Sequence, residues 1–359
     1  QMLVDGWSLP PLFEEFLSLY RALSEGRDLE LPRPRPFRDY IAWLRRQDLE
    51  AAEAFWRQSF AGFTEPTPIP MDRPTAAPRI YAEAFRFLPA AATETLQAFA
   101  RRHRLTLNSL VQGAWAELLA RRGGVSDVLF GVTVSGRPAD LPGVEDMVGL
   151  FINTLPFRAR CRQGQVLPWL QGVQDQLSRI RQFEYTPLAE IQRWVGSSHG
   201  SLFDSFLVFQ NYPLESGSAA GGEGGTEALG AGGTETEERS TYALTLVVYP
   251  GEELVLDLEY DAARFDATTV ERQLRHLEHL LADMAARPEA NLENLSLLSP
   301  AEAHQLRVEW RSPAAAATPE TLSLHGLVAA QAERTPDAMA VLCGDTALTY
   351  AELRRRAGA

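Results

Sequence analysis

The stretch that most constrains the fold of this chain is residues 128–134, a nearly continuous run of apolar side chains of strand length. A strand that is apolar on both faces is typical of a sheet covered on both sides, usually by helices. Before it, residues 107–122 show a helical pattern, with Thr106 as its cap and a glycine pair, Gly123 and Gly124, as its stop. The sequence therefore predicts a buried strand at residues 128–134 that follows a capped helix.

A second informative stretch is the beginning of the chain, where an apolar run stops at a carboxylate, a glycine and a tryptophan. Residues 2–4 are expected to end a buried strand, Asp5 and Gly6 to form a tight turn, and Ser8 to cap a helix. This pattern fits an ordinary strand-turn-helix connection. It also fits a functional site, and the residues alone leave both interpretations open.

The spacing of apolar residues predicts most of the other elements. Helices are expected at residues 9–24, 37–60, 91–104, 166–185 and 267–286, the last capped by Asp266, and strands at residues 80–88, 148–156, 203–213, 242–249 and 253–260. Residues 216–239 are too poor in apolar side chains to pack, so we predict a disordered surface loop there.

Composition excludes several classes of function. The chain has 359 residues, enough for two or more compact units, and a net charge of -13 argues against nucleic acid as a main partner. It contains arginine but no lysine, which excludes a phosphate-binding loop and a lysine Schiff base in this stretch. Cys161 and Cys343 are too few for a thiolate metal cage, and His276 and His279 are interpreted as surface residues. With no membrane span expected, the sequence predicts a cytoplasmic protein without a metal.

Two segments around the central run carry a family resemblance. Residues 135–138 read Ser-Gly-Arg-Pro, residues 148–156 read Val-Gly-Leu-Phe-Ile-Asn-Thr-Leu-Pro, and residues 5–6 read Asp-Gly. In order and separation they resemble the landmarks of condensation domains of nonribosomal peptide synthetases, and residues 37–43 are similar to an aromatic element of the same family. The resemblance implies a two-lobed α/β (α+β) fold of mixed sheets and flanking helices, like that of chloramphenicol acetyltransferase.

The resemblance also implies a division of the chain into domains. Residues 1–78 would be the remainder of the first lobe and a crossing segment, and residues 79–296 the second lobe. Strands of the absent part of the first lobe are expected to cover the apolar stripes of residues 9–24 and 37–60. After a linker at residues 297–323, residues 324–359 resemble the start of an amino-acid adenylation domain.

The implied activity is peptide-bond formation between two aminoacyl or peptidyl thioesters. Both would be carried on phosphopantetheine arms of peptidyl carrier proteins, one upstream and one downstream, with the adenylation domain adjacent in the same polypeptide. The resemblance implies no directly bound cofactor and no metal. Nucleic acid and membranes are not expected as partners.

By resemblance, the catalytic positions begin with Gln1, which stands where the family has the second histidine of its motif, and continue with Asp5 and Gly6. Trp7, Ser135, Arg137 and Asn153 are expected to line or support the tunnel. A buried Asp5 should be paired with an arginine. The resemblance places that arginine in the absent part of the first lobe, and Arg137 is the local substitute.

Some alternatives remain open at this stage. The polar side chain of Asn153 could belong to a site, or it could be a structural group with satisfied hydrogen bonds. Because Gln1 replaces the histidine, the chain could also be a catalytically degenerate domain that serves as a platform for a carrier protein or a tailoring enzyme. Another acyltransferase of the same fold is a third possibility. Epimerisation is disfavoured, since residues 209–213, Phe-Gln-Asn-Tyr-Pro, lack the expected glycine.

Overall fold

The computed structural model describes residues 3–63, 66–73, 78–161, 164–196, 201–210, 242–310, 323–343 and 346–358. The chain divides into two compact units, Gln1–Leu297 and Leu298–Ala359, and each is described by itself. The lobe boundary at residues 78 and 79, the linker limits and the adenylation start stay predictions. The loop predicted at residues 216–239 lies outside the described residues.

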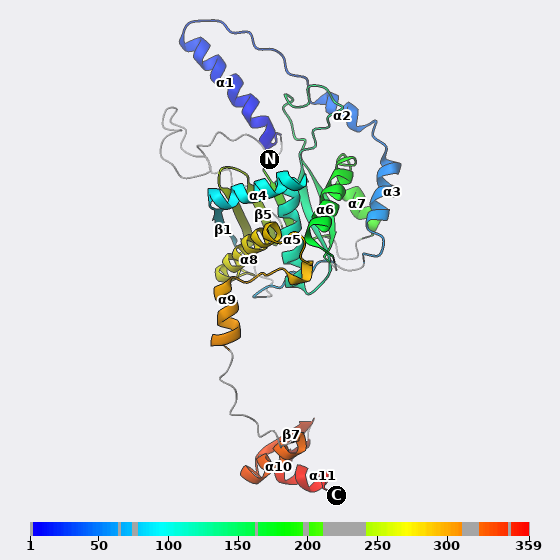
Figure 1. Cartoon of the computed structure of the whole chain (residues 1–359). Coiled ribbons are helices and arrows are strands. Elements are labelled where there is room, and N and C mark those ends of the chain that lie inside the picture. The colour runs from blue at the N-terminus through cyan, green and yellow to red at the C-terminus, as the bar shows by residue number, and fades with distance from the viewer. Residues whose placement is uncertain are drawn as a thin grey trace. The chain divides into compact units, whose positions relative to one another are not determined.

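The first unit contains both helices and strands (Figure 1). Its helices are α1 (Leu9–Ser24), α2 (Arg38–Leu44), α3 (Leu49–Ser59), α4 (Ala90–His103), α5 (Leu107–Gly123), α6 (Val166–Arg181), α7 (Leu188–Val195) and α8 (Ala267–Ala286), with short 3-10 turns η1 (Gly6–Ser8) and η3 (Leu292–Asn294). Its strands are β1 (Tyr81–Leu88), β2 (Asp127–Val134), β3 (Asn153–Arg160), β4 (Ser205–Phe209), β5 (Leu244–Tyr249) and β6 (Leu254–Asp261). The predicted α/β fold is confirmed.

The strands form one mixed sheet of six, in the order β1-β6-β5-β4-β2-β3. The β2-β4 and β4-β5 pairs are parallel, and the β1-β6, β5-β6 and β2-β3 pairs are antiparallel. Strand β2 contains the apolar run of residues 128–134 that was predicted to be a buried strand. It lies near one edge, beside β3, whereas β1 forms the opposite edge.

Helices α4, α5 and α8 lie across one face of the sheet (Figure 1). Helix α5 is central: every residue from Ser109 to Ala120 is buried, as expected for a helix packed on all sides. It begins at Thr106, whose hydroxyl accepts the backbone N–H of Ser109 at 3.0 Å, and ends at Gly124 in the left-handed conformation, so both predicted ends are confirmed. Within the described residues, no helix combines the length and the apolarity needed to cross a membrane.

The single long helix predicted for residues 37–60 is wrong. The structure has two helices, and α3 restarts at Asp48, whose side chain accepts the N–H of Ala51 at 2.9 Å. A capping aspartate competes with continued helix, which explains the break. The aromatic residues of this segment are also buried without any contribution from another lobe. Trp56 is 1% exposed in the main core, and Tyr40 and Trp43 are buried in a smaller cluster.

Other boundaries also need correction. Residues 148–152 are not a strand, because β3 begins only at Asn153. Helix α6 ends at Arg181, four residues earlier than predicted at residue 185. Asp266 precedes α8 as predicted but makes no capping bond, since its carboxylate pairs with Arg73. His276, interpreted as a surface residue, is buried on α8.

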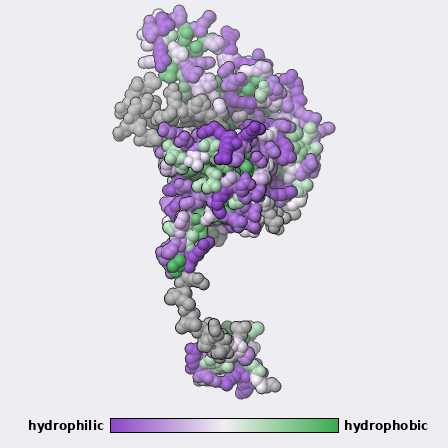
Figure 2. All heavy atoms as spheres, in the orientation of Figure 1, coloured by the Kyte–Doolittle hydropathy of each residue, from purple (hydrophilic) through white to green (hydrophobic). Residues whose placement is uncertain are grey.

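Helix α1 differs from the other long helices because much of its apolar face is uncovered. Phe13, Phe16 and Leu23 are exposed by 62%, 55% and 70%. Figure 2 shows this apolar surface among polar side chains. Residues 9–24 and 37–60 were both expected to be covered by the absent part of the first lobe. In the described structure, only α1, which spans the first of these segments, leaves a large apolar face exposed.

The second unit is small. It contains α9 (Pro300–His304), a π turn η4 (Gln305–Glu309), α10 (Leu324–Arg334), an antiparallel pair β7 (Met339–Cys343) and β8 (Thr346–Thr349), and α11 (Tyr350–Ala357). Thr349 caps α11 in a capping box with Glu352. Residues 300–309, predicted as part of a linker, are therefore helical, and residues 311–322 lie outside the described part.

Candidate functional site

Asp5 is the buried carboxylate around which the candidate site is built; 1% of the residue is exposed. It precedes η1, and its Oδ1 accepts the backbone N–H of Ser8 at 3.0 Å and the hydroxyl of Ser8 at 2.8 Å. This bonding forms the tight turn predicted at Asp5 and Gly6. Leu3 and Val4 lie outside any strand, so the predicted strand end is wrong for these residues, and Met2 lies outside the described part.

Ser8 joins this turn to a segment far away in the sequence. Its Oγ lies 2.9 Å from the carbonyl oxygen of Gly149 and accepts the N–H of Gly149 at 3.1 Å. The N–H of Asp5 donates to the same carbonyl at 3.0 Å. Ser8 stands at the start of α1 as predicted, but it makes no capping bond to the helix. Its hydroxyl is used to hold the turn against residue 149.

Arg137 is the ion-pair partner of Asp5. Its Nη2 lies 3.1 Å from Asp5 Oδ1, and both side chains are almost fully buried. Its Nη1 donates to the carbonyl oxygens of Val144 and Met147 at 2.5 and 2.9 Å, and its guanidinium lies 4.1 Å from the centre of the Phe151 ring. The predicted pairing of Asp5 with an arginine is confirmed, and the partner is the local one.

The carboxylate of Asp5 accepts hydrogen bonds on both of its oxygens. Oδ1 receives Ser8 N–H, Ser8 Oγ–H and Arg137, and Oδ2 receives the N–H of Phe151 at 3.0 Å. These bonds come from the turn itself, through Ser8, and from two distant residues, Arg137 and Phe151. The carboxylate therefore ties its own turn to both of those segments. Its chemistry is that of a positioning residue, which fixes the turn relative to residues 137–151.

Gly136 and Gly149, in the segments around Arg137, stand at positions where no side chain fits. Gly136 has φ +63°, and a Cβ there would lie 1.8 Å from the carbonyl oxygen of Phe151. A Cβ on Gly149 would lie 2.2 Å from the ring of Phe37. Both positions therefore exclude any larger residue, because distances below about 3.0 Å require the backbone or a packed ring to move.

Aromatic side chains of residues 37–43 pack against the segment that carries Phe151. Phe151 packs against Tyr40 and Phe37, with ring centres 4.6 and 5.0 Å apart, and Trp43 Nε1 donates to Asp140 at 3.1 Å. Burial, together with the charges of Glu184 and Asp5, raises the pKa of Tyr40 to about 12, so its phenol stays neutral. The aromatic element at residues 37–43 thus forms core under the site, as its apolar spacing predicted.

The structure places the remaining predicted residues differently. Asn153 is held by backbone: its amide donates to the carbonyls of Glu184 and Thr186, both at 2.8 Å, and its Oδ1 accepts Thr154 N–H. These are the bonds of the structural alternative, and they fix the 184–186 loop. Ser135 is exposed beside Gly136, and its contact with reactants stays a prediction.

Gly6 and Trp7 lie in the turn η1 itself and are half-buried. Gln1 lies outside the described residues, so its proposed place at the motif stays a prediction. Sequence reasoning did not assign a site role to Ser8, Gly149 or Phe151. The signal that could have found Ser8 is its spacing: a serine three residues after an aspartate can donate back to that carboxylate within one turn.

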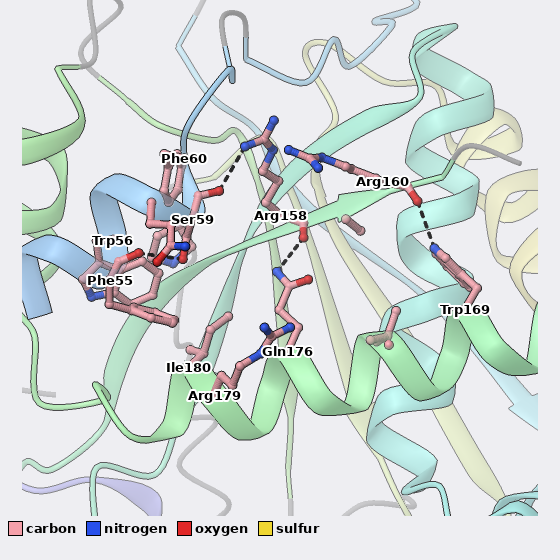
Figure 3. A pocket seen from close by; sticks show the side chains of 15 residues that line it. Phe55, Trp56, Ser59, Phe60, Arg158, Arg160, Trp169, Gln176, Arg179 and Ile180 are labelled. Carbon is pink, nitrogen blue, oxygen red and sulfur yellow. Dashed lines mark hydrogen bonds between the residues drawn. The ribbon is translucent and has the colours of Figure 1, made fainter. Parts of the chain in front are cut away.

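A cavity of about 540 Å³ lies between α3, β3 and α6 (Figure 3). Phe55 and Trp169 contribute aromatic surface, and Arg158, Arg160 and Arg179 contribute positive charge. Arg158 is ion-paired with Asp127 at 2.7 Å, and Trp169 donates to the carbonyl of Arg160 at 3.0 Å. None of the described site residues named above lines this cavity, so it is separate from the Asp5 site.

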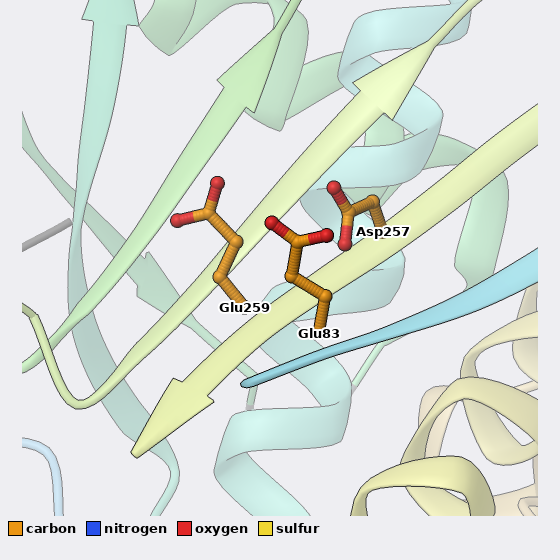
Figure 4. A group of neighbouring side chains, drawn as sticks. All are labelled: Glu83, Asp257 and Glu259. Atoms are coloured by element: carbon orange, nitrogen blue, oxygen red, sulfur yellow. The ribbon is translucent and has the colours of Figure 1, made fainter. Parts of the chain in front are cut away.

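A second carboxylate cluster lies on strands β1 and β6, where Glu83, Asp257 and Glu259 converge (Figure 4). Burial and the charges of the two glutamates raise the pKa of Asp257 to about 8. Within the described residues, this is the group of His, Cys, Asp and Glu side chains that is close enough together to hold a metal ion. The sequence had indicated a strand there but no cluster.

Sequence comparison gives a family match over most of the chain. Residues 2–307 match the family described as Condensation domain. One of the linear gramicidin synthase proteins of Brevibacillus parabrevis is 46% identical over 362 residues, which is 99% of this chain and 5% of that protein. Bacitracin synthase 3 of Bacillus licheniformis is 34% identical over 360 residues, which is 99% of this chain and 6% of that protein. The chain therefore spans a small part of the length of these relatives.

Structural comparison gives the same fold. A four-domain nonribosomal peptide synthetase bound to AMP and glycine matches 98% of this chain and 28% of its own, with a TM-score of 0.69 and 17% identity. The first condensation domain of the calcium-dependent antibiotic synthetase, in complex with a substrate analogue, matches 83% of this chain and 65% of its own, with a TM-score of 0.65 and 20% identity. The predicted fold class is thus confirmed.

Proposed function

This chain belongs to the condensation domains of nonribosomal peptide synthetases, and from that premise we propose that it forms the greater part of a domain that makes a peptide bond. The observation that carries the proposal is the buried bonding of Asp5 and Ser8 to Arg137 and Gly149. It joins three separate segments of the family motif into one rigid group, as a site that must hold two reactants in register requires.

The proposed reaction is the attack of an acceptor amine on a donor thioester. The nitrogen forms a bond to the carbonyl carbon, the carbon-sulfur bond breaks, and the donor arm leaves as a thiol with the proton that the amine loses. Both acyl groups would arrive on phosphopantetheine arms of carrier proteins, one upstream and one downstream. Because tethering aligns the two reactants, it can supply an effective concentration of about 10⁵–10⁸ M.

Asp5 and Arg137 act in this proposal by position. Asp5 is bonded to Ser8, Arg137 and Phe151, and Arg137 is bonded to two carbonyls as well as to the carboxylate, so both residues hold backbone segments in place. Their task in this proposal is to fix the turn at Gly6 and Trp7. The amine-orienting group is proposed at residue 1, four positions before Asp5, where the family has a histidine and this chain has Gln1.

The proposed domain organisation follows the sequence predictions. Residues 1–78 complete a first lobe whose remainder would cover the bare apolar face of α1, and residues 79–296 form the second lobe. Residues 324–359 begin an adenylation domain in the same polypeptide. No metal or directly bound cofactor takes part in the proposed reaction, and the protein is proposed to act in the cytoplasm.

A second candidate is a degenerate domain that binds a carrier protein or a tailoring enzyme without catalysis. The observation that favours it is Gln1, because an amide can donate and accept hydrogen bonds but cannot take a proton near neutral pH. Loss of a general base costs about 10²–10⁴-fold in rate. We therefore expect slow condensation and not its complete absence, since the alignment of the tethered arms would remain.

The test is single-turnover transfer between two loaded carrier proteins, catalysed by the domain restored to full length. Peptide transfer above the rate without enzyme supports condensation, and a Gln1→His variant should be faster by about 10²–10⁴-fold. Equal rates for the two forms would show that residue 1 does not limit the reaction. No transfer by either form, with carrier-protein binding intact, would favour the platform function.

A further inference from the structure

The carboxylates of Glu83, Asp257 and Glu259 come from two paired strands and lie on one face of the sheet. In the antiparallel register, Glu83 of β1 is directly opposite Glu259 of β6, and Asp257 is two residues before Glu259. Residues two apart on a strand point to the same face, so the three side chains meet. Figure 4 shows their carboxylates turned toward one another, and each offers an oxygen within 4.8 Å of the others.

Asp257 is the residue that makes this arrangement unusual. Only 3% of it is exposed, and its Oδ1 has no hydrogen-bond partner among the described residues. Its cross-strand neighbours are apolar, Phe85 on β1 and Val247 on β5. A buried carboxylate oxygen without a donor costs several kcal/mol, and buried charges in proteins are normally paired or bound to metal. The open face of Oδ1 therefore points to a positive ligand.

We propose that Glu83, Asp257 and Glu259 bind a divalent cation, calcium, which fastens the edge strand β1 to β6. The donor set consists of oxygen atoms alone, which suits calcium, magnesium or manganese and disfavours zinc or copper. Calcium binds oxygen at about 2.3–2.6 Å, so oxygens on opposite sides of it lie up to about 5 Å apart. Magnesium, at about 2.0–2.1 Å, spans only about 4.2 Å. Oxygens as far apart as 4.8 Å can share calcium without moving.

The surrounding contacts leave room for the ion. The hydroxyl of Tyr81 donates to Glu83 Oε1 at 2.6 Å, which orients this side chain and leaves its second oxygen for the metal. Each carboxylate has about four acceptor positions, so a bond to the ion does not require other bonds of Glu83 or Glu259 to break. Glu83 is exposed, so water can complete the six to eight ligands that calcium prefers.

The site is independent of the proposed condensation chemistry. It lies on β1 and β6, whereas Asp5 contacts the segments that flank β2 and β3, at the other side of the sheet. Its function would be structural: the ion removes the repulsion between the three carboxylates and holds the edge strand in place. Failure of this proposal would therefore leave the proposed function unchanged, and the reverse also holds.

The direct test is isothermal titration calorimetry of the 359-residue chain, stripped of metal with a chelator, against calcium chloride and separately magnesium chloride. We expect one calcium ion per chain to bind below about 1 mM, with magnesium at least tenfold weaker. The thermal unfolding midpoint should rise with calcium. The absence of calcium binding up to about 10 mM, or tighter binding of magnesium than of calcium, would overturn the proposal.

Variants locate the ion. Asp257→Asn keeps the shape of the side chain but removes its charge, so it should weaken calcium binding at least tenfold. Glu259→Gln should weaken calcium binding to the same extent. This second variant provides the test if Asp257→Asn fails to fold. The control is Glu253→Gln, an exposed glutamate in the neighbouring turn, which should bind calcium as the parent does. Unchanged affinity in both cluster variants would show that calcium binds elsewhere and would refute the site.

Terbium gives a second, position-specific readout because it replaces calcium and emits when a nearby aromatic side chain absorbs. Tyr81, bonded to Glu83, is placed to sensitise it. Calcium should displace the emission, and Tyr81→Phe should lower the emission at least threefold while calcium still binds. Emission that calcium does not displace, or that is equal in the Tyr81→Phe and parent chains, would contradict binding at this cluster.

Discussion

Asp5 and Asp257, two of the buried aspartates among the described residues, have opposite electrostatic surroundings. Asp5, at the turn before α1, is surrounded by donors: an arginine, a hydroxyl and two backbone N–H groups. Asp257, in the middle of β6, is surrounded by two glutamates and apolar side chains, with one oxygen that no described residue bonds. Both residues are almost fully buried. What differs is whether the protein supplies the positive charge itself.

This difference separates a completed structural group from an incomplete one. At Asp5, the bonds tie its own turn, through Ser8, to Arg137 and Phe151, so the carboxylate holds the turn and residues 137–151 together. At Asp257, burial and then the nearby charges of Glu83 and Glu259 raise the pKa, so the folded chain increases the cost of the charge. Removing the charge should therefore destabilise the protein at Asp5 and stabilise the metal-free protein at Asp257. The following experiments test this contrast.

The largest effect is expected for Arg137→Met in the domain restored to full length. Methionine fills the volume but leaves the Asp5 charge buried without its partner and two carbonyls without donors. The stability should fall by about 3–5 kcal/mol, and peptide transfer should be lost with it. Chemical denaturation measures the first effect. An Arg137→Lys control keeps the charge but not the fork-shaped donor set, and should be intermediate. Equal stability of the parent and Arg137→Met would contradict the role of this pair.

Asp5→Asn should have a smaller but clear effect. The asparagine amide keeps one acceptor oxygen, while its NH₂ group replaces the oxygen that accepts Phe151 N–H. One donor then faces another donor, which costs about 2 kcal/mol. We expect lower stability in denaturant and slower transfer, because the turn is no longer held. Unchanged folding and an unchanged condensation rate would show that Asp5 does not order the motif.

The sequence predicted those parts of the fold in which a local pattern decides the outcome. The apolar run of β2 and the capped helix α5 depend on periodicity and end signals, and the structure confirms both. The break between α2 and α3 was missed because aromatic spacing suggested continuity, whereas Asp48 starts a new helix. Residues 148–152 were expected to be a strand because they are apolar, but their backbone N–H groups serve Ser8 and Asp5 instead.

At the candidate site too, the sequence did not predict contacts that depend on how distant segments meet. The pairing of Asp5 with an arginine followed from the cost of a buried charge, and the arginine could be named because Arg137 was the local cation in the motif segments. The bonds of Asn153 to residues 184 and 186 could not be derived, because they depend on how two loops meet. The same holds for Asp257, since no local pattern shows that β1 and β6 are neighbours.

Asp257→Asn should reverse the sign seen at Asp5. In chelator at about pH 9, above the Asp257 pKa of about 8, removing one of three neighbouring charges should stabilise the chain by about 1–3 kcal/mol, because the asparagine is neutral and its NH₂ can donate to a glutamate. With calcium present, the parent should recover this difference and the variant should not respond. Denaturant titrations with and without calcium measure both effects. A destabilised variant in chelator would mean that Asp257 has a donor after all, and the contrast with Asp5 would fail.

The smallest effect is expected for a substitution at Ser135. It tests whether the residues held by Asp5 and Arg137 present a side chain to the reactants. Ser135 is exposed next to Gly136, so Ser135→Ala should change the stability by less than about 0.5 kcal/mol. If Ser135 faces the reactants as predicted, Ser135→Ala in the restored domain should remove one neutral hydrogen bond from the transition state. This loss of about 1 kcal/mol corresponds to a roughly fivefold slower transfer.

The matched control is Ser178→Ala, at an exposed serine on α6, which should change neither the stability nor the transfer rate. A Ser135→Ala rate equal to that of this control would remove Ser135 from the site. The rigid group at Asp5 would then hold the turn without presenting this hydroxyl to the reactants.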